Sequence, residues 1–194
     1  MNRIIFIATL FFIAISASSQ NGGELTFEVK IIDEVRAVMY LNPNDINSDT
    51  TIMVVPFENG GFKLIFPEKM DENLLYPIAH ITIKGIHISN KKAKTNTVEG
   101  IFAYKNNEPI GSFKFLAETS DSFIYTYFQY VDNDVSMKGI GITGTFVYDL
   151  DLKKGWNIVY IISSNSHFGK TDTFTTQKPD ANFIWHYGCY NLFD

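Results

Sequence analysis

Residues 146–162 read FVYDLDLKKGWNIVYII and decide the fold class. Large apolar side chains occupy every second position from Phe146 to Leu152, with Val or Asp between them. Because successive side chains on a strand point to opposite faces, this alternation is typical of a half-buried β-strand. Lys154-Gly155 separates it from a second apolar run, residues 156–162. The stretch therefore predicts a β-hairpin.

The same pattern recurs on both sides of this stretch. Short alternating or β-branched runs are separated by turn-forming residues, most clearly Asn-Gly-Gly at 59–61 and Asn-Asn-Glu-Pro at 106–109. Only residues 68–75 predict helix, over one or two turns. Roughly eleven or twelve strands predict an all-β fold, an antiparallel β-sandwich that is immunoglobulin-like or related, built as one body or as two packed β lobes. The other expected strands are residues 25–31, 35–41, 51–57, 62–66, 81–84, 86–88, 101–105, 110–116, 123–130, 171–176 and 182–187.

The start of the chain indicates export. Arg3 is followed by an apolar run at 4–15 and by small residues at 16–19, which is the pattern of a signal peptide cleaved near residue 19. The apolar run is shorter than the ~20 residues that span a bilayer, so we expect no transmembrane segment in the mature chain. A lipoprotein would carry a cysteine after the small residues, where Gln20 stands. We therefore expect a periplasmic or secreted protein, not a lipoprotein, with one domain at 20–194 and a sub-boundary at 67–77.

Charge and cysteine content narrow the choice of partners. The chain has 16 Lys and Arg against 21 Asp and Glu, a net charge of −5, which loss of Arg3 with the signal makes one unit more negative. This disfavours nucleic acid, which needs a basic face. Cys189 is the single cysteine, so no internal disulfide can form. We interpret it as a small, partly buried side chain rather than a reactive thiol.

Two glycine motifs resemble cofactor sites but lack their context. Gly139, Gly141 and Gly144 have the spacing of a dinucleotide-binding turn, which requires a helix to follow at once. Residues 145–150 predict a strand instead. Gly169-Lys170-Thr171 resembles the end of a phosphate-binding loop, but a strand follows and Ser164 stands where the first glycine is required. We therefore predict no cofactor.

Polar clusters offer catalytic and metal-binding alternatives. A secreted hydrolase would use Ser166, His167 and Asp172, with Ser163 and Ser164 nearby, although a polar hairpin tip explains the same residues. Calcium could bind oxygens at 132–134 or at 44–49, but Asp and Asn also form turns for their own backbone hydrogen bonds. We predict no catalytic and no metal-binding residue. The acidic and amide residues concerned are Asp132, Asn133, Asp134, Asn44, Asp45, Asn47 and Asp49, and the histidines, which lack the spacing of a zinc site, are His80, His87, His167 and His186.

Residues 123–130 read FIYTYFQY and contain the strongest candidate for a ligand surface. On a strand, Tyr125, Tyr127 and Gln129 share one face, and the residues between them share the other. One face would join the core, and the other would form a flat aromatic strip suited to a sugar ring or a partner chain. Cross-strand packing inside a sandwich is the alternative. A basic group, Lys91, Lys92 and Lys94, is interpreted as a solvated turn.

Residues 130–139, 149–157 and 175–179, followed by Trp185, resemble the second half of a group of exported β-sandwich proteins and lipoproteins of Bacteroidetes for which no activity is known. The first half, at 62–67 and 75–78, is similar but looser. The resemblance implies a cell-envelope location and β architecture, and it implies no functional residue.

We therefore predict an exported, non-catalytic binding or structural module of the cell envelope, whose partner is a glycan or an envelope protein. One alternative is a lipocalin-like barrel that carries a small apolar ligand. A second is a secreted hydrolase or a calcium-dependent protein.

Overall fold

The computed structural model describes residues 32–42, 45–80, 84–166 and 169–188. Strands account for 64% of these residues, and the helical segments among them are two 3-10 turns, η2 (Glu72–Leu74) and η3 (Ile78–His80). Asp71 caps η2 by accepting a 2.9 Å hydrogen bond from the Asn73 backbone N–H. The helix expected at 68–75 is therefore one short turn. The export signal, the strand expected at 25–31, residues 81–83 and Cys189 lie outside the described residues.

The described strands form one twelve-stranded sheet. Its path runs β2-β1-β5-β6-β7-β10-β11-β9-β8-β4, with β12 paired to β6 and β3 paired to β5. The strands are β1 (Glu34–Asn42), β2 (Asp45–Pro56), β3 (Tyr76–Pro77), β4 (Ile86–Ile88), β5 (Lys94–Lys105), β6 (Glu108–Glu118), β7 (Ser122–Val131), β8 (Val135–Ile140), β9 (Phe146–Leu152), β10 (Gly155–Ser166), β11 (Gly169–Thr175) and β12 (Ile184–Gly188).

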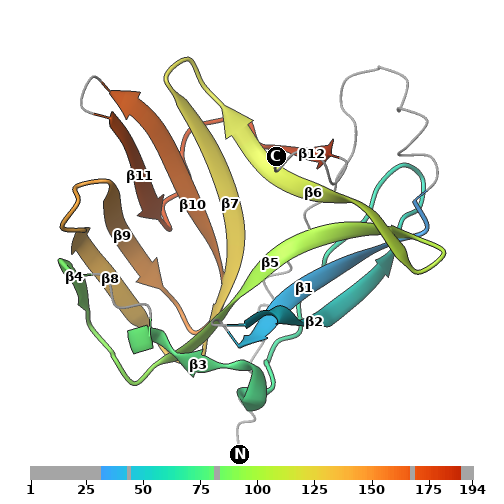
Figure 1. The fold of residues 1–194 in the computed structure, drawn as a ribbon, viewed down its shortest axis with the longest axis horizontal. Helices are drawn as coiled ribbons and strands as arrows, with labels where there is room; N and C mark the ends of the chain where they lie inside the picture. Colours follow the sequence, from blue (N-terminus) through green and yellow to red (C-terminus); the bar gives the residue numbers. More distant parts are fainter. Residues whose placement is uncertain (1–31, 43–44, 81–83, 167–168, 189–194) are drawn as a thin grey trace, which may run out of the picture.

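The sheet bends into two arms, so the predicted all-β, sandwich-like architecture is confirmed. Figure 1 shows a first arm of β1, β2, β5 and β6 and a second arm of β7, β10, β11, β9, β8 and β4. The described path begins at β2 and ends at β4, and these two strands do not pair with each other. The described sheet is thus open and not a closed barrel.

The stretch that predicts a hairpin, residues 146–162, does form two strands, but β9 and β10 do not pair with each other. β11 lies between them, antiparallel to β10 and parallel to β9. The expected hairpin, and a purely antiparallel sheet, are therefore wrong at this point. Side chains hold the turn instead: Asn157 Oδ1 accepts from the Lys153 N–H at 2.9 Å, and Asp134 Oδ1 accepts from the Lys154 N–H at 2.8 Å. The backbone N–H groups of Lys153 and Lys154 therefore have side-chain acceptors and need no backbone hydrogen bonds between β9 and β10.

Both other turn signals form turns, but only the one at 106–109 joins two strands. Asn106 and Asn107, with φ of 50° and 67°, join β5 to β6 in the left-handed conformation of a hairpin turn. Asn59 has a φ of 54° and Gly60 a φ of 76°, and the backbones of Glu58 and Gly61 exchange two hydrogen bonds around them. The strand expected at 62–66 does not follow; Phe62 and Leu64 of this segment are buried against side chains of β1, β5 and β6.

Two main clusters of buried side chains hold the arms together. In the first cluster, residues 62–66 supply Phe62 and Leu64 to the face formed by β1, β5, β6 and β7. The second lies between β4, β7, β8, β9 and β10. The segment 67–77 is tied to both arms, since Trp156 of β10 donates a 2.8 Å hydrogen bond to the Pro67 carbonyl and Asn96 of β5 donates a 2.6 Å bond to that of Leu74.

Candidate functional site

The two arms meet at an opening between β5, β6 and β7. β5 pairs with β6 from Ile101 onward, and it pairs with β7 only through its residues 95–97. β6 pairs with β7 only from Leu116 onward. These three pairings leave a triangle whose sides are residues 98–100, 114–115 and 126–128. Figure 1 shows β6 and β7 diverging from their shared turn toward β5. No ladder pair bridges this triangle in the described chain.

Local features of the strands create the opening. The pairing of β5 with β1 shifts by one residue, from Val38↔Gly100 to Met39↔Val98, so residue 99 is an extra residue at a β-bulge. Such a bulge bends its strand. Across the triangle, the Thr126 hydroxyl donates a 2.6 Å hydrogen bond to the Phe115 carbonyl, so a side chain spans the point where β6 and β7 separate.

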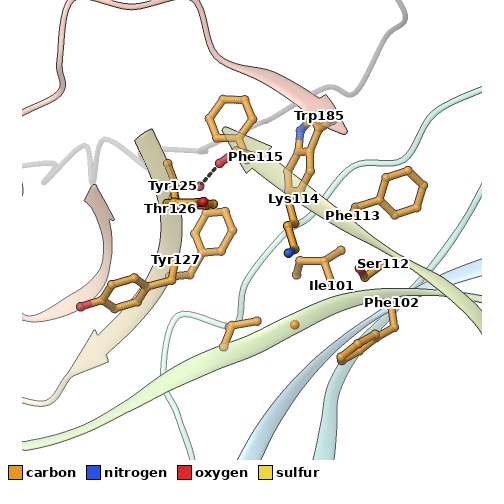
Figure 2. A pocket seen from close by; sticks show the side chains of 13 residues that line it. Ile101, Phe102, Ser112, Phe113, Lys114, Phe115, Tyr125, Thr126, Tyr127 and Trp185 are labelled. Carbon is orange, nitrogen blue, oxygen red and sulfur yellow. Dashed lines mark hydrogen bonds between the residues drawn. The ribbon is translucent and has the colours of Figure 1, made fainter. Parts of the chain in front are cut away.

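A pocket of about 240 Å³ occupies the opening. Figure 2 shows aromatic rings around it and the Lys114 side chain extending from β6 toward Ile101 and Ser112. Lys114 is the one charged residue among those that line the pocket. The lining residues are Val98, Gly100, Ile101, Phe102, Ser112, Phe113, Lys114, Phe115, Tyr125, Thr126, Tyr127, Phe128 and Trp185.

The strand registers divide these residues into two sets. Ser112, Lys114 and Leu116 occupy every second position of β6, so their side chains lie on one face of the sheet. The cross-strand partners of Ser112 and Leu116 are Phe102 and Tyr125, which therefore lie on the same face. Tyr127 follows Tyr125 on that face. A polar pair, Ser112 and Lys114, is therefore framed by three aromatic rings. The opposite face supplies an apolar floor that belongs to the first core cluster: Ile101, Phe113 and Phe128.

Two of the three residues predicted to form a ligand surface, Tyr125 and Tyr127, line this pocket. Tyr125 is 37% exposed and Tyr127 is half-buried against the second core cluster, and both line the pocket. Gln129 is only 1% exposed and does not line it, because β5 and β7 resume their pairing at this residue. Its amide Nε2 donates a 2.9 Å bond to Thr95 Oγ1, while its Oε1 has no hydrogen-bond partner. The three residues therefore share a face but do not form one exposed strip.

Sequence reasoning missed Lys114, Ser112 and Phe102. Their strands follow from the runs at 101–105 and 110–116, but nothing in those runs indicates that β6 leaves β5 and that a pocket opens beside them. Trp185 was also missed. Its ring packs on Phe62 at 5.1 Å and on Phe115 at 5.2 Å between ring centroids, and its buried indole Nε1 has no hydrogen-bond partner.

Of the candidate hydrolase residues that the structure describes, Ser166 and Asp172 are not brought together. Asp172 accepts a hydrogen bond from the Ser163 hydroxyl and lies 3.5 Å from Lys170 Nζ. In the β10–β11 ladder Ser163 is paired with Asp172 and Ser166 with Gly169. Three residue steps therefore separate Ser166 from Asp172 along the ladder, about 10 Å. His167 lies outside the described residues.

The candidate calcium residues serve as structural acceptors. Asp132 Oδ1 accepts from the Lys94 N–H at 2.7 Å. Asp134 accepts from the Lys154 N–H and, at 3.1 Å, from Lys153 Nζ. The backbone bond from Lys154, followed by the bond from Lys153, lowers the pKa of the Asp134 carboxyl below its ordinary value of 3.8. Asp45, Asn47 and Asp49 lie within strand β2 rather than in a loop, and Asn44 is outside the described residues.

The remaining motifs are structural. Gly139 lies in β8, and the turn containing Gly141 and Gly144 leads into β9. Gly169-Lys170-Thr171 opens β11, so no helix follows either motif, as predicted. Lys91 and Lys92 form an exposed turn, and Lys94 begins β5. Among the residues described here, no group of three or more His, Cys, Asp or Glu could hold a metal ion. The described histidines, His80, His87 and His186, are exposed on three separate elements.

Comparisons of the chain with protein-family models, curated protein sequences and solved structures give no match. No helix in the described part of the chain is long and apolar enough to cross a membrane.

Proposed function

We propose that this protein is an exported, non-catalytic binding module of the cell envelope and that it binds a saccharide in the pocket between β5, β6 and β7. The observation that carries the proposal is the grouping of Tyr125, Tyr127 and Phe102 around Ser112 and Lys114. The flat, apolar face of a sugar ring packs well on aromatic rings, and its hydroxyl groups need polar partners. The pocket supplies both.

The volume of the pocket favours a single sugar ring as the bound part of the ligand. Its volume of about 240 Å³ is below the ~300 to 1,000 Å³ of pockets for drug-sized ligands, so one sugar ring is a better fit than a long chain segment. The open path of the described sheet disfavours the barrel alternative. The separation of Ser166 from Asp172 along the ladder disfavours the hydrolase alternative.

Glycan-array binding tests the proposal. We expect the wild-type protein to be retained by a subset of glycans, and we expect Tyr125→Ala to weaken that retention by about tenfold or more. The stacking of a flat ring on an aromatic side chain contributes roughly 1–3 kcal/mol in the well-studied case of nucleobases. Tyr125 is exposed, so this substitution should leave folding intact. Tyr104→Ala is the matched control, because Tyr104 is a partly buried ring on β5 that packs under Arg36, outside the pocket.

Two results would count against the proposal. One is a wild-type protein that is retained by no glycan. The other is a Tyr125→Ala variant that is retained as well as the wild type.

Export is supported by the pattern of residues 1–19, and it is tested separately. Expression of the full chain in a Gram-negative host, followed by fractionation and N-terminal sequencing, should yield a periplasmic or secreted product that begins near residue 20. An uncleaved product in the cytoplasm would contradict export without bearing on the pocket.

A further inference from the structure

We propose that the turn between β8 and β9 docks the protein on a lipid surface by inserting Ile140, Ile142 and Phe146 among the lipids. This inference goes beyond saccharide binding and concerns a different part of the molecule. Figure 1 shows the turn at the outer edge of the second arm, away from β5 and β6. Three features carry the inference: the exposure of these side chains on both faces of the sheet, the hydrogen-bonded backbone of the turn, and the charges around it.

Exposed apolar side chains are concentrated at this turn. Seven large hydrophobic residues are exposed in the described chain, and three of them lie between positions 140 and 146. Ile142 and Ile140 are the two most exposed of the seven, at 65% and 61%, and Phe146 is 38% exposed. No residue from 139 to 148 carries a charge. Apolar surface gathered in this way marks a site of contact with a partner or a membrane.

The apolar side chains of the turn point to both sides of the sheet. Ile140 is paired with Val147 in the β8–β9 ladder, and Phe146 precedes Val147 on β9. Successive residues of a strand face opposite sides, so Ile140 and Phe146 project from opposite faces. A rigid protein surface packed on one face would leave the other in water, whereas a fluid lipid layer surrounds both. The arrangement therefore favours lipid over a protein partner.

The backbone of the turn is hydrogen-bonded within the protein. The Gly141 N–H donates to the Phe146 carbonyl at 2.8 Å, and the Gly144 N–H donates to the Gly141 carbonyl at 2.7 Å. The Ile142 N–H donates to the Lys84 carbonyl at 3.2 Å, which ties the turn to the segment that leads into β4. A backbone donor that leaves water without an acceptor costs free energy. These donors keep their acceptors when the turn enters a lipid interface.

The charges around the turn suit the phosphates of an anionic lipid surface. Two acidic residues near the turn are each paired with a lysine: Asp149 lies 2.5 Å from Lys138, and Asp172 lies 3.5 Å from Lys170. Exposed Lys84, whose carbonyl holds the turn, adds a positive charge beside it. A lysine next to inserted apolar side chains keeps its ammonium in the headgroup layer, where anionic lipids attract it.

Flotation with lipid vesicles tests the inference. The mature protein is mixed with vesicles of phosphatidylcholine, alone or with phosphatidylglycerol, and centrifuged through a density gradient. We expect the wild type to float with both and to bind the mixed vesicles several-fold more tightly. Ile142→Asp should weaken binding about tenfold or more, because the burial of an isoleucine side chain is worth at least that factor. Ile65→Asp is the matched control: Ile65 is 54% exposed outside the turn, and this variant should float as the wild type does.

Further variants test the charge and the insertion separately. Lys84→Gln should float with phosphatidylcholine as the wild type does and lose the added affinity for phosphatidylglycerol. Ile142→Trp should gain fluorescence that shifts to shorter wavelength with vesicles and is quenched by brominated lipid, and Ile65→Trp should not. Circular dichroism establishes that each variant is folded, and Ile142→Ser replaces Ile142→Asp if the latter is not.

The outcomes that contradict the inference are distinct. A wild type that floats with neither kind of vesicle would overturn it, as would an Ile142→Asp variant that floats as well as the wild type. A mass that rises with concentration in light scattering, without flotation and only while Ile142 is intact, would assign the turn to contact between copies of this chain instead. An unchanged preference of Lys84→Gln for phosphatidylglycerol would overturn the part assigned to Lys84. None of these results bears on saccharide binding.

Discussion

The Thr126 hydroxyl donates a 2.6 Å hydrogen bond to the Phe115 carbonyl at the point where β6 and β7 separate. This bond replaces a backbone pairing that the opening interrupts. It therefore links the stability of the sheet to the shape of the pocket, whose wall includes both residues.

Thr126→Val should lower the free energy of unfolding by about 1 kcal/mol, because it removes the donor and keeps the shape of the side chain. Urea denaturation measures the change. Thr126→Ser retains the hydroxyl and should be closer to the wild type. Equal stability of the valine variant and the wild type would mean that the bond contributes nothing to the sheet.

Gly139→Ala should be strongly destabilising. Gly139 has a φ of 134°, and a Cβ at this residue would overlap the backbone carbonyl of Gly85, which itself has a φ of 100°. Backbone strain and this overlap should together cost about 3 kcal/mol or more. Gly144→Ala is the control, because Gly144 has a φ of 71° but no heavy atom within 4 Å of the added Cβ. Its cost should be about 1 kcal/mol, from strain alone. Similar melting temperatures for the two variants would contradict the close approach of the two backbones.

Leu64→Ala and Ile65→Ala should differ sharply although the residues are neighbours. Leu64 is 1% exposed within the first core cluster, and Ile65 is 54% exposed. The first substitution should cost about 2–5 kcal/mol and the second less than about 0.5 kcal/mol. Denaturant unfolding of both variants tests whether residues 62–66 pack on the sheet as described. Comparable losses would show that they do not.

The carboxyl of Asp134 should titrate below pH 3.8 in the folded protein, because the Lys154 N–H and the Lys153 ammonium stabilise its charged form. A lowered pKa contributes stability above the unfolded-state pKa, and that contribution is lost as the pH falls through the folded-state pKa. Asp134→Asn should therefore unfold with a weaker dependence on pH below about 4. Carbon-detected NMR titration gives the pKa directly. A value at or above 3.8 would contradict the contacts at the β9–β10 turn.

The fold class follows from local patterns alone, since residues 146–152 alternate with the period of a strand and residues 35–41 and 101–105 are short β-branched or aromatic runs. The choice of strand partners does not follow from them. Residues 146–162 have the pattern of a hairpin, yet β11 separates the two strands, and the Asp134 side chain that helps to hold the turn comes from a distant part of the chain. Alternation describes the faces of a strand but not its neighbours.

The same distinction explains the outcome for the site. Tyr125 and Tyr127 could be placed on one face because their spacing determines it. The burial of Gln129 depends on where β7 rejoins β5, and the position of Lys114 beside the pocket depends on where β6 departs from β5. Both pairing boundaries depend on how β5, β6 and β7 are arranged relative to one another, so neither can be predicted from a single stretch of sequence.

The position of β11 between β9 and β10 also bears on how the chain reaches its native state. The native neighbour of both strands, residues 169–175, is synthesised after them and must take its place between them. Contacts of this kind close long loops and slow folding. The newly made β9 and β10 would expose unpaired edges during that interval, which makes this the stage at which aggregation competes most strongly with folding.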